Sequence, residues 1–519
     1  MKNSPSATSP FAPDADAAPD WETVDRRAWE AIVNWPRAVA FDPVRDGLDY
    51  SELTRWFLWD KVGRAVRKQL TPERFAIEIE ELGWEKPPRG VLPHLPGVRT
   101  AWQRLGDLKY QAKIAWRHRR QRKAYRQHIL ERPAKTNQPL LFIPVPTERL
   151  LNTARTLLDY GDMQLYAPET QYRIDDVVRI PYPKGLPKPA TGFAAQLHGA
   201  ILEGLARQGI HLLEPDAETL KAEIDKQQIQ LAAARAYLDD VTPDVMLLSA
   251  DNHPTHQHYV LLGRLRGIPT MMLQHGLDCE HYYLDNAYAT AIAVWGPNRK
   301  QRYEQHSDWQ PERITVTGNP QYDGHRLAEV MNPGGEYWLW VTRPHTSAKC
   351  YAPSRSPWEA VEILEALLDA LEANPGKQLL IKPHPRDAIP LLEDTLGKRG
   401  LGERAQIVDT PPMQLFPAAS VVISEDSTAG MEAMLLGKPV VHAHFAPAPP
   451  TMAFVDYDAA LPGFNPLELA ESIVTAENLD EAAQKAMLAG QRRFIEDHAG
   501  PCDGKAAERV REFILEILK

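Results

Sequence analysis

Short apolar runs alternate with longer segments of mixed polarity from residue 139 to the end of the chain. Segments 191–208 and 219–238 are expected helices, and the apolar runs between such segments are typical of buried strands. Strands that alternate with helices predict a parallel sheet. In the first part of this region we expect strands at 140–145, 163–166, 210–213, 245–249, 270–273, 290–294 and 314–316.

A second α/β unit follows the sequence Pro333-Gly334-Gly335, which we interpret as a hinge. Its expected strands are 337–340, 378–381, 407–408, 420–423 and 440–442, and 357–373 is an expected helix. We therefore predict two Rossmann-like α/β domains, 139–332 and 333–519. We also expect a last helix at 504–519 that closes over the rest.

The region before residue 139 differs in composition from these two units. Residues 1–20 are rich in Pro, Ala and Ser and are expected to form a disordered tail. Residues 21–133 are expected to be mostly helical. The packing anchors that we expect in this region are Trp21, Trp29, Trp35, Trp56, Trp59 and Trp84.

Segment 109–132 is basic although the chain as a whole is acidic. Its six nearly consecutive cations, with Trp116 and Tyr125 among them, are Arg117, Arg119, Arg120, Arg122, Lys123 and Arg126. A basic helix with aromatic residues can lie on an anionic membrane surface, which is the peripheral contact that we expect here. An acidic glycan, a nucleic acid or the protein's own acidic groups are alternative partners.

Composition narrows the class of protein. A net charge of −10 argues against a general nucleic-acid binder, and we expect no nucleic-acid partner. Three widely spaced cysteines predict neither a disulfide framework nor a metal site. There is no apolar run of membrane-spanning length, and the N-terminus lacks the basic-then-apolar order of a signal peptide. We expect a soluble cytoplasmic protein that contacts the inner face of the membrane peripherally.

The first candidate site lies directly after the expected strand 378–381. Here Lys382, His384 and Arg386 alternate with two prolines. Proline restricts its own φ and favours an extended residue before it. Alternate side chains of an extended segment point to the same face, so these three can together bind a phosphate or diphosphate. A basic loop without a ligand is the alternative.

The second candidate site follows the expected strand 420–423. Ser424, Ser427 and Thr428 stand where a strand ends and a helix begins, and hydroxyl side chains cap helix starts. The exposed N–H groups and the dipole of a helix N-terminus also favour an anion. Glu432, one turn into the helix, can hold ribose hydroxyls. The alternative is an ordinary capped helix with a solvated glutamate.

Both motifs together resemble the GT-B glycosyltransferases of bacterial surface polysaccharides over roughly residues 140–500. The Lys382–Arg386 segment resembles the His-Pro motif of CMP-sugar users, and Ser427-Thr428 resembles their paired hydroxyls. The closest resemblance is to capsule and O-antigen Kdo transferases and to sialyl- and polysialyltransferases. It implies that His384, Ser427 and Thr428 bind the donor phosphate.

Three other segments, 249–254, 274–276 and 295–297, follow strands of the first domain and are expected to face the second. Asp251 is the best candidate for a catalytic acid, acting as nucleophile or general base, with a turn-capping role as the alternative. His275 precedes Gly276 and resembles the His-Gly of CDP-glycerol glycerophosphotransferases, where it is base or phosphate ligand. The histidines at 253, 256 and 258 match no standard zinc spacing, so no metal is expected.

The resemblance implies a glycosyltransferase that moves Kdo or a sialic-acid-like sugar from a CMP-linked donor to a glycan or lipid-linked acceptor. The nucleotide sugar would be a substrate, and no separate cofactor is expected. Three alternatives stay open. The Lys-Pro-His-Pro run is shared with CDP-glycerol glycerophosphotransferases, and the 427–433 helix start is similar to UDP-GlcNAc 2-epimerases. A catalytically silent glycan- or protein-binding member is the third.

Overall fold

The structure is a computed structural model of the 519-residue chain. It describes residues 21–70, 72, 75, 137–169, 177–187, 190–251, 253–277, 288–306, 313–343, 357–384, 387, 389–446 and 450–519. The expected tail 1–20, the basic segment 109–132 and Arg386 lie outside these residues. Within them, no helix has both the length and the apolarity needed to cross a membrane.

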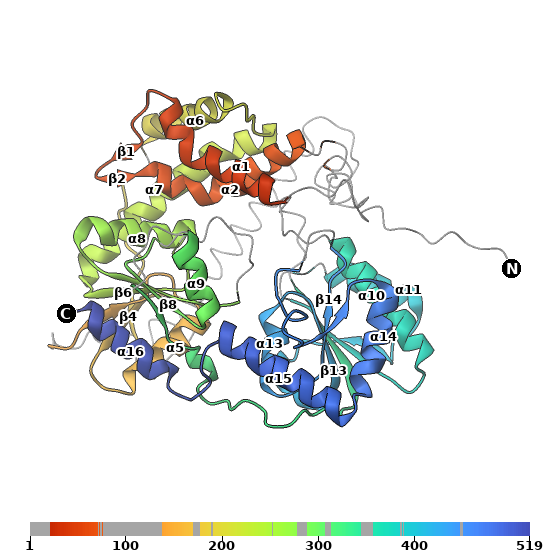
Figure 1. Ribbon diagram of the computed structural model, residues 1–519. Coiled ribbons are helices and arrows are strands. Elements are labelled where there is room, and N and C mark those ends of the chain that lie inside the picture. The colour runs from red at the N-terminus through yellow and green to blue at the C-terminus, as the bar shows by residue number, and fades with distance from the viewer. Residues whose placement is uncertain are drawn as a thin grey trace.

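The first domain is built on a parallel sheet of seven strands in the order β5-β4-β3-β6-β7-β8-β9 (Figure 1). Every neighbouring pair is parallel, and the order reverses between β3 and β6, as in a doubly wound fold. The strands are β3 (Leu140–Phe142), β4 (Gln164–Pro168), β5 (Val178–Ile180), β6 (Val245–Leu248), β7 (Thr270–Leu273), β8 (Ala291–Val294) and β9 (Ile314–Val316).

The second domain repeats this plan with six parallel strands in the order β12-β11-β10-β13-β14-β15. They are β10 (Tyr337–Val341), β11 (Leu379–Lys382), β12 (Ala405–Ile407), β13 (Ala419–Ser424), β14 (Val440–Ala443) and β15 (Leu461–Gly463). The order reverses between β10 and β13. The two parallel Rossmann-like sheets confirm the predicted α/β, GT-B-like fold class.

Helices cover both faces of the first sheet because its strands are apolar on both sides. One face packs on α6 (Thr191–Ala206), α7 (Glu214–Val241) and α8 (Pro254–Arg266). The other face packs on α5 (Glu148–Leu158) and on the C-terminal helix α16 (Ala506–Ile517), through Val510, Phe513 and Ile514. Helix α9 (Pro297–His306) follows β8. The last helix thus returns to the first sheet, although its residues fall in the range 333–519 that we expect to form the second domain.

The second sheet is covered in the same way. On one face lie α10 (Pro357–Ala373), α11 (Ile389–Arg399) and α14 (Pro466–Glu477), which pack against Trp338 and Trp340 of β10. On the other face lie α13 (Thr428–Leu435) and α15 (Glu481–His498). The short helices α12 (Pro412–Leu415) and η5 (Phe416–Ala418) lead into β13, and η4 (Pro320–Tyr322) follows β9.

The N-terminal part forms a helical layer on the first domain (Figure 1). It contains α1 (Trp21–Asn34), η1 (Trp35–Ala38), a hairpin of β1 (Val44–Arg45) and β2 (Leu48–Asp49), and α2 (Tyr50–Leu70). Trp35 and Trp59 are buried as anchors in the shared core, as expected, and the side chains of Trp21 and Trp84 are not described. A buried ion pair joins Arg64 of α2 to Asp216 of α7 at 2.6 Å.

Two details differ from the predicted elements. Residues 210–213 form no strand but the link between α6 and α7, where Ile210 is buried by helix packing rather than by sheet pairing. The sequence pattern also missed the edge strands β5 and β15. Each is three residues long, and β15 contains a proline and a glycine, which obscure a strand pattern.

Candidate functional site

The carboxyl edges of the two sheets meet at the domain interface. In the segment after β7, the backbone N–H of Leu277 donates a hydrogen bond to Oγ1 of Thr428, the first residue of α13 after β13 (3.2 Å). A Cβ added to Gly276 would lie 3.7 Å from the same Oγ1. The predicted motif Ser427-Thr428 and the predicted segment His275-Gly276 are therefore neighbours across the interface.

The start of α13 is built as the sequence predicts. Ser427 is the N-cap residue, and its hydroxyl accepts a hydrogen bond from the N–H of Ala429. The helix lies tightly on its own strand, because a Cβ on Gly430 would come within 2.8 Å of Ser424 Oγ and 3.0 Å of Phe454. Only glycine permits this approach, which places the helix N-terminus directly at the sheet edge.

A second contact across the interface involves Glu432. The Tyr322 hydroxyl, from η4 of the first domain, donates to Glu432 Oε1 at 3.1 Å. Burial raises the pKa of Glu432, an effect partly offset by the nearby cation of Arg149 and by the hydrogen bond from Tyr322. Glu432 is thus half-buried between the two domains rather than solvated on an outer helix face.

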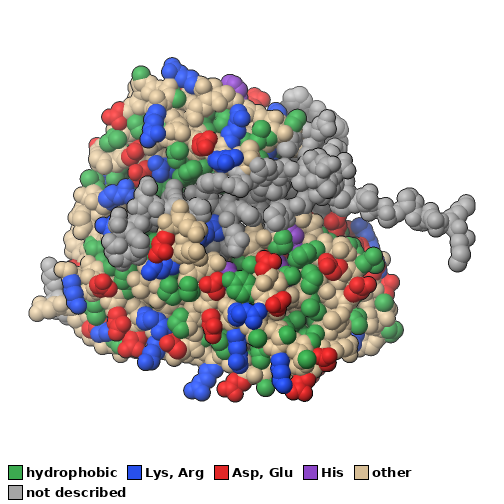
Figure 2. Space-filling view, viewed as in Figure 1, with side chains coloured by type: hydrophobic (Ala, Val, Ile, Leu, Met, Phe, Trp, Pro, Cys, Tyr) green, Lys and Arg blue, Asp and Glu red, His purple; other side chains and the backbone are tan. Residues whose placement is uncertain are grey.

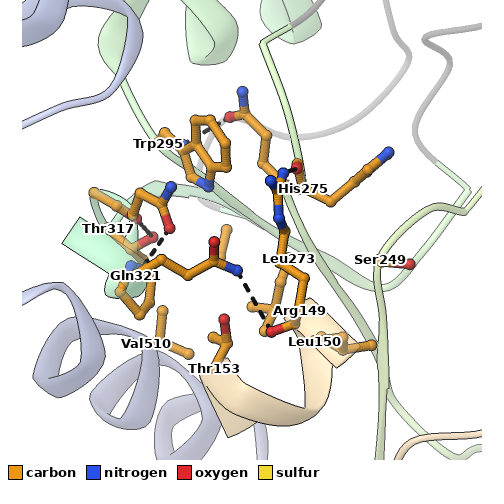
Figure 3. Close-up of a pocket in the computed structure, with 15 residues that line it drawn as sticks. Arg149, Leu150, Thr153, Ser249, Leu273, His275, Trp295, Thr317, Gln321 and Val510 are labelled. Carbon is orange, nitrogen blue, oxygen red and sulfur yellow. Dashed lines mark hydrogen bonds between the residues drawn. The ribbon is translucent and has the colours of Figure 1, made fainter. Parts of the chain in front are cut away.

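On the first domain, Arg149 and His275 line the same edge (Figure 3). Arg149 donates to the His275 carbonyl at 2.6 Å and fixes the loop after β7. The small pocket beside them holds about 20 Å³, room for little more than one water molecule. The His275 side chain keeps accessible surface, yet desolvation by surrounding protein atoms, together with the Arg149 and Arg299 cations, lowers its pKa. The ring is therefore neutral near pH 7 and can accept a proton.

The Lys382–Arg386 motif follows β11, as expected from the sequence. The His384 N–H donates to Thr342 Oγ1 (2.9 Å) and to Asp387 Oδ2 (3.0 Å), which holds the turn against the end of β10. Lys382 Nζ pairs with Asp409 at 3.2 Å. The Lys382 side chain is mostly buried, and its partner Asp409 belongs to the same domain.

Two of the predicted site residues are turned into the protein. Ser424 is fully buried, and its hydroxyl donates to the Glu425 carbonyl at 2.9 Å. Asp251 is 2% exposed, and its Oδ2 accepts hydrogen bonds from the N–H groups of Tyr288 (2.8 Å) and Ala289 (3.2 Å). The Asp251 geometry matches the capping alternative, since the carboxylate fixes the chain just before β8.

A cluster around Asp426, which the sequence analysis did not single out, lies beside the start of α13. The buried Asp426 carboxylate accepts hydrogen bonds from His442 Nε2 (2.8 Å) and from the N–H groups of Thr451 and Met452 (3.1 Å each). Arg343, two residues after the end of β10, approaches it at 3.4 Å. Asp426 therefore holds together the chain segments that follow β10, β13 and β14.

Asp426, His442 and His444 also offer three potential metal-ligand atoms within 4.8 Å of one another. The carboxylate, however, is already bound to two backbone amides and to His442. The guanidinium of Arg343 beside it disfavours a second cation. These residues fit a hydrogen-bonded cluster better than a metal centre.

Sequence reasoning also missed Arg149, Tyr322 and Arg343. All three lie at or after the ends of elements that face the interface, and Arg343 lies three residues after the end of the expected strand 337–340. A search for polar residues after every expected strand would have found Arg343. Arg149 and Tyr322 lie in a helix and a turn, so only their tertiary contacts reveal them.

Replacing Asp251 with alanine is expected to lower the free energy of unfolding by about 2–4 kcal/mol, because two buried N–H groups lose their acceptor. Asp251→Asn keeps an acceptor oxygen and is expected to be much less destabilised. Urea denaturation of the three proteins measures both effects, and equal stability of all three would contradict the capping role.

The same residue predicts a pH effect. Burial raises the pKa of Asp251 from 3.8 to about 6. The folded protein then binds a proton more tightly than the unfolded chain, so this contribution is fully present below pH 3.8 and is lost as the pH rises through 6. Between pH 7 and pH 5 we expect wild type to gain about 1 kcal/mol relative to Asp251→Asn, measured by urea denaturation at both pH values. An unchanged difference would exclude the raised pKa.

Comparisons with known proteins assign no family: no family model and no curated protein matches the sequence. Similar solved structures include the UDP-GlcNAc 2-epimerase of Neisseria meningitidis bound to UDP-GlcNAc, with 12% identity, a TM-score of 0.47 and coverage of 73% of this chain and 100% of that one. A glycosyltransferase of Rickettsia africae ESF-5 has 12% identity, a TM-score of 0.45 and coverage of 74% and 100%. HepE of Anabaena in complex with UDP and glucose has 13% identity, a TM-score of 0.42 and coverage of 73% of this chain and 100% of that one. Likenesses of this size assign neither activity nor substrate.

Proposed function

We propose that this protein is a glycosyltransferase that binds a nucleotide-linked sugar at the interface of its two domains. The observation that carries the proposal is the contact of Thr428 with Leu277, which brings the carboxyl edges of two parallel sheets together at a helix N-terminus. Ligands of open α/β folds bind at this edge, outside the carboxyl ends of the strands. A helix N-terminus there favours the negative charge of a phosphate.

The donor phosphate is assigned to α13 and to the turn after β11. Thr428 Oγ1 accepts the hydrogen bond from Leu277, so its own proton is available for a phosphate oxygen. The Ser427 hydroxyl and the N–H of Thr428, the first of α13, add donors, because the next two N–H groups already bind Ser427. The His384 imidazole adds a further donor. Lys382 and Arg386 contribute positive charge, which stabilises the leaving nucleotide as negative charge develops on it.

Glu432 is assigned to the ribose. Its Oε1 is held by Tyr322, which fixes the side chain, and the second carboxylate oxygen can accept a hydrogen bond from a ribose hydroxyl. Ser424 is left out of this donor site because its buried hydroxyl is bound to the backbone. In this proposal the nucleotide therefore spans α13 while its sugar points toward the first domain.

His275 is assigned as the general base. Its neutral imidazole takes the proton of an acceptor hydroxyl. The acceptor oxygen forms a bond to the donor sugar carbon, and the bond from that carbon to the phosphate oxygen breaks with its electron pair remaining on the phosphate. Asp251 accepts hydrogen bonds from the N–H groups of Tyr288 and Ala289 and so fixes the chain before β8. We therefore assign it a positioning role instead of a catalytic one.

The donor class is proposed to be a CMP-linked Kdo or sialic-acid-like sugar, and the acceptor a growing surface glycan or a lipid-linked glycan. This finer assignment depends on the resemblance of the Lys382–Arg386 and Ser427-Thr428 segments to CMP-sugar users. Peripheral contact of segment 109–132 with an anionic membrane would bring the enzyme to a lipid-linked acceptor.

A nucleotide screen tests the donor class. We expect CMP to raise the melting temperature of the protein more than UMP, CDP or UDP at equal concentration, because a ligand that binds the folded state more tightly stabilises it more. A preference for CDP would indicate the glycerophosphotransferase alternative. A preference for UDP would contradict the CMP assignment, and incubation with UDP-GlcNAc would then show whether the sugar is epimerised at C2 without any acceptor.

A further inference from the structure

A second cavity lies away from the domain interface, between the N-terminal helical layer and the first domain. Its volume is about 450 Å³, within the range of small-molecule sites. The lining comes from the β1–β2 hairpin, the start of α2, residues 184–187 and 190, and one face of α7, near the β1, β2 and α7 labels in Figure 1. No residue of the second domain is among its described lining.

The hairpin that forms one wall is rigidly placed. Asp46 and Gly47 make a two-residue turn with φ of 53° and 77°, the geometry of a type I′ turn. A Cβ on Gly47 would lie 2.9 Å from Leu265 of α8, so the turn packs directly against the first domain. Arg45, the last residue of β1, is thereby held at the cavity.

The lining is cationic. Arg45, Lys184 and Arg235 contribute three positive charges, and neither Arg45 nor Lys184 has an ion-pair partner among the described residues. Arg235 reaches Asp46 only at 3.9 Å. The other carboxylate, Asp239, is already neutralised by Arg266 at 2.8 Å. On the face shown in Figure 2, basic and acidic side chains are interspersed.

The hydroxyl of Tyr50 adds a polar group to the cavity wall. Tyr50 is 6% exposed and lines the cavity, and its hydroxyl makes no hydrogen bond with any described residue. Its ring is fixed by an edge-on contact with Phe193 at 4.9 Å, and the same Phe193 carries the guanidinium of Arg45 at 4.8 Å. Contact with the Phe193 ring thus positions both the Tyr50 side chain and the Arg45 guanidinium.

Most of the remaining lining is apolar, with Leu186, Pro187 and Leu231 among its residues, and Gln228 adds a polar side chain. An apolar wall beside fixed cations and a hydroxyl suits the two aspects of a sugar ring: its C–H faces and its polar substituents. An aliphatic ligand would leave the cations and the Tyr50 hydroxyl without partners, which costs free energy.

We propose that this cavity binds an anionic saccharide unit, a sugar that carries a carboxylate or a phosphate, and so holds the acceptor glycan at a distance from the transfer site. The naming of a saccharide rests on the proposed function, whereas the preference for a hydroxylated anion rests on Arg45, Lys184, Arg235 and Tyr50. Arg45 and Lys184 bind the acid group, and Tyr50 donates to a ring hydroxyl.

Calorimetric titration of the full-length protein tests this site. The probes are a sialic acid tetramer (carboxylates), a glycerol phosphate oligomer (phosphates), inorganic phosphate, and maltotetraose as the neutral control. At least one anionic oligomer is expected to bind, and its affinity should fall at least about tenfold in the double variant Arg45→Gln/Lys184→Gln, equivalent to about 1.4 kcal/mol. Which oligomer binds more tightly identifies the acid group.

Tyr50→Phe removes only the hydroxyl and is expected to weaken the same oligomer at least about threefold, while keeping the contact with Phe193. Unchanged melting temperatures would show that these variants fold, and CMP affinity should stay at the wild-type value. Equal binding of maltotetraose, binding of inorganic phosphate alone, or full affinity in the double variant would each overturn the proposal. Oligomer binding without any nucleotide binding would leave this site standing and refute the proposed function instead.

Discussion

Replacing His384 with alanine is expected to weaken nucleotide binding by about 10- to 100-fold and to lower turnover at least as much. The imidazole belongs to a turn that Thr342 and Asp387 hold at the end of β10 and β11 through the His384 N–H. Alanine keeps this backbone arrangement, so the variant removes the side chain alone. A hydrogen bond to a charged phosphate contributes about 1.5–3 kcal/mol, which corresponds to the stated loss of affinity.

The measurement is a titration with CMP, or with whichever nucleotide the screen selects, followed by a transfer assay. His211→Ala is the matched control, because His211 is exposed in the link between α6 and α7 and lies in the first domain. We expect it to bind and turn over like wild type. Should His384→Ala bind the nucleotide with wild-type affinity, the phosphate would have to lie elsewhere, and the assignment of the 382–386 segment would be wrong.

Replacing Asp426 with alanine is expected to destabilise the second domain by about 3–5 kcal/mol, the size of effect seen when one partner of a buried charged pair is removed. Two buried amides, at Thr451 and Met452, and the ring of His442 would lose their acceptor together. The side chain of Arg343 would lose its buried partner as well. Activity should fall with stability, since the segment after β13 carries Ser427 and Thr428.

Thermal unfolding measures this effect, and a drop in Tm of the order of 10 °C is expected. Lys485→Ala is the control: its pair with Glu481 is shorter than the Asp426 pairs, at 2.6 Å, but lies in solvent, and such pairs contribute at most about 1 kcal/mol. An Asp426→Ala protein as stable as this control would contradict the stabilising role of Asp426 in the second domain. Restored stability in Asp426→Asn, which keeps an acceptor oxygen, would separate hydrogen bonding from charge.

The candidate site was predictable in part because strand ends are local features. Ser427, Thr428 and His384 follow apolar runs directly, and the structure places them at strand ends as the pattern predicts. Asp251 follows a strand in the same way, yet it is buried and caps Tyr288 and Ala289. A sequence pattern says which residue follows a strand. It does not say whether a distant segment will cover that residue.

Residues that act through long-range contacts were harder to find. Asp426 looks like an ordinary residue of a helix start, and its partners lie between 16 and 26 residues later or 83 residues earlier in the chain. The contact between Tyr322 and Glu432 joins two domains. Neither set of partners leaves a periodic signal in the sequence, because periodicity reports only which face of an element is buried.

The order of strands and helices was determined by the sequence itself, since apolar runs and helical segments encode burial locally, and the two-domain α/β plan followed from their alternation. Three features were decided only by tertiary packing: the return of α16 to the first sheet, the loss of the expected strand 210–213 to a helix–helix link, and the meeting of Leu277 with Thr428. Each of these features depends on contacts between segments that are far apart in the sequence, and a local pattern does not show which distant segments will pack together.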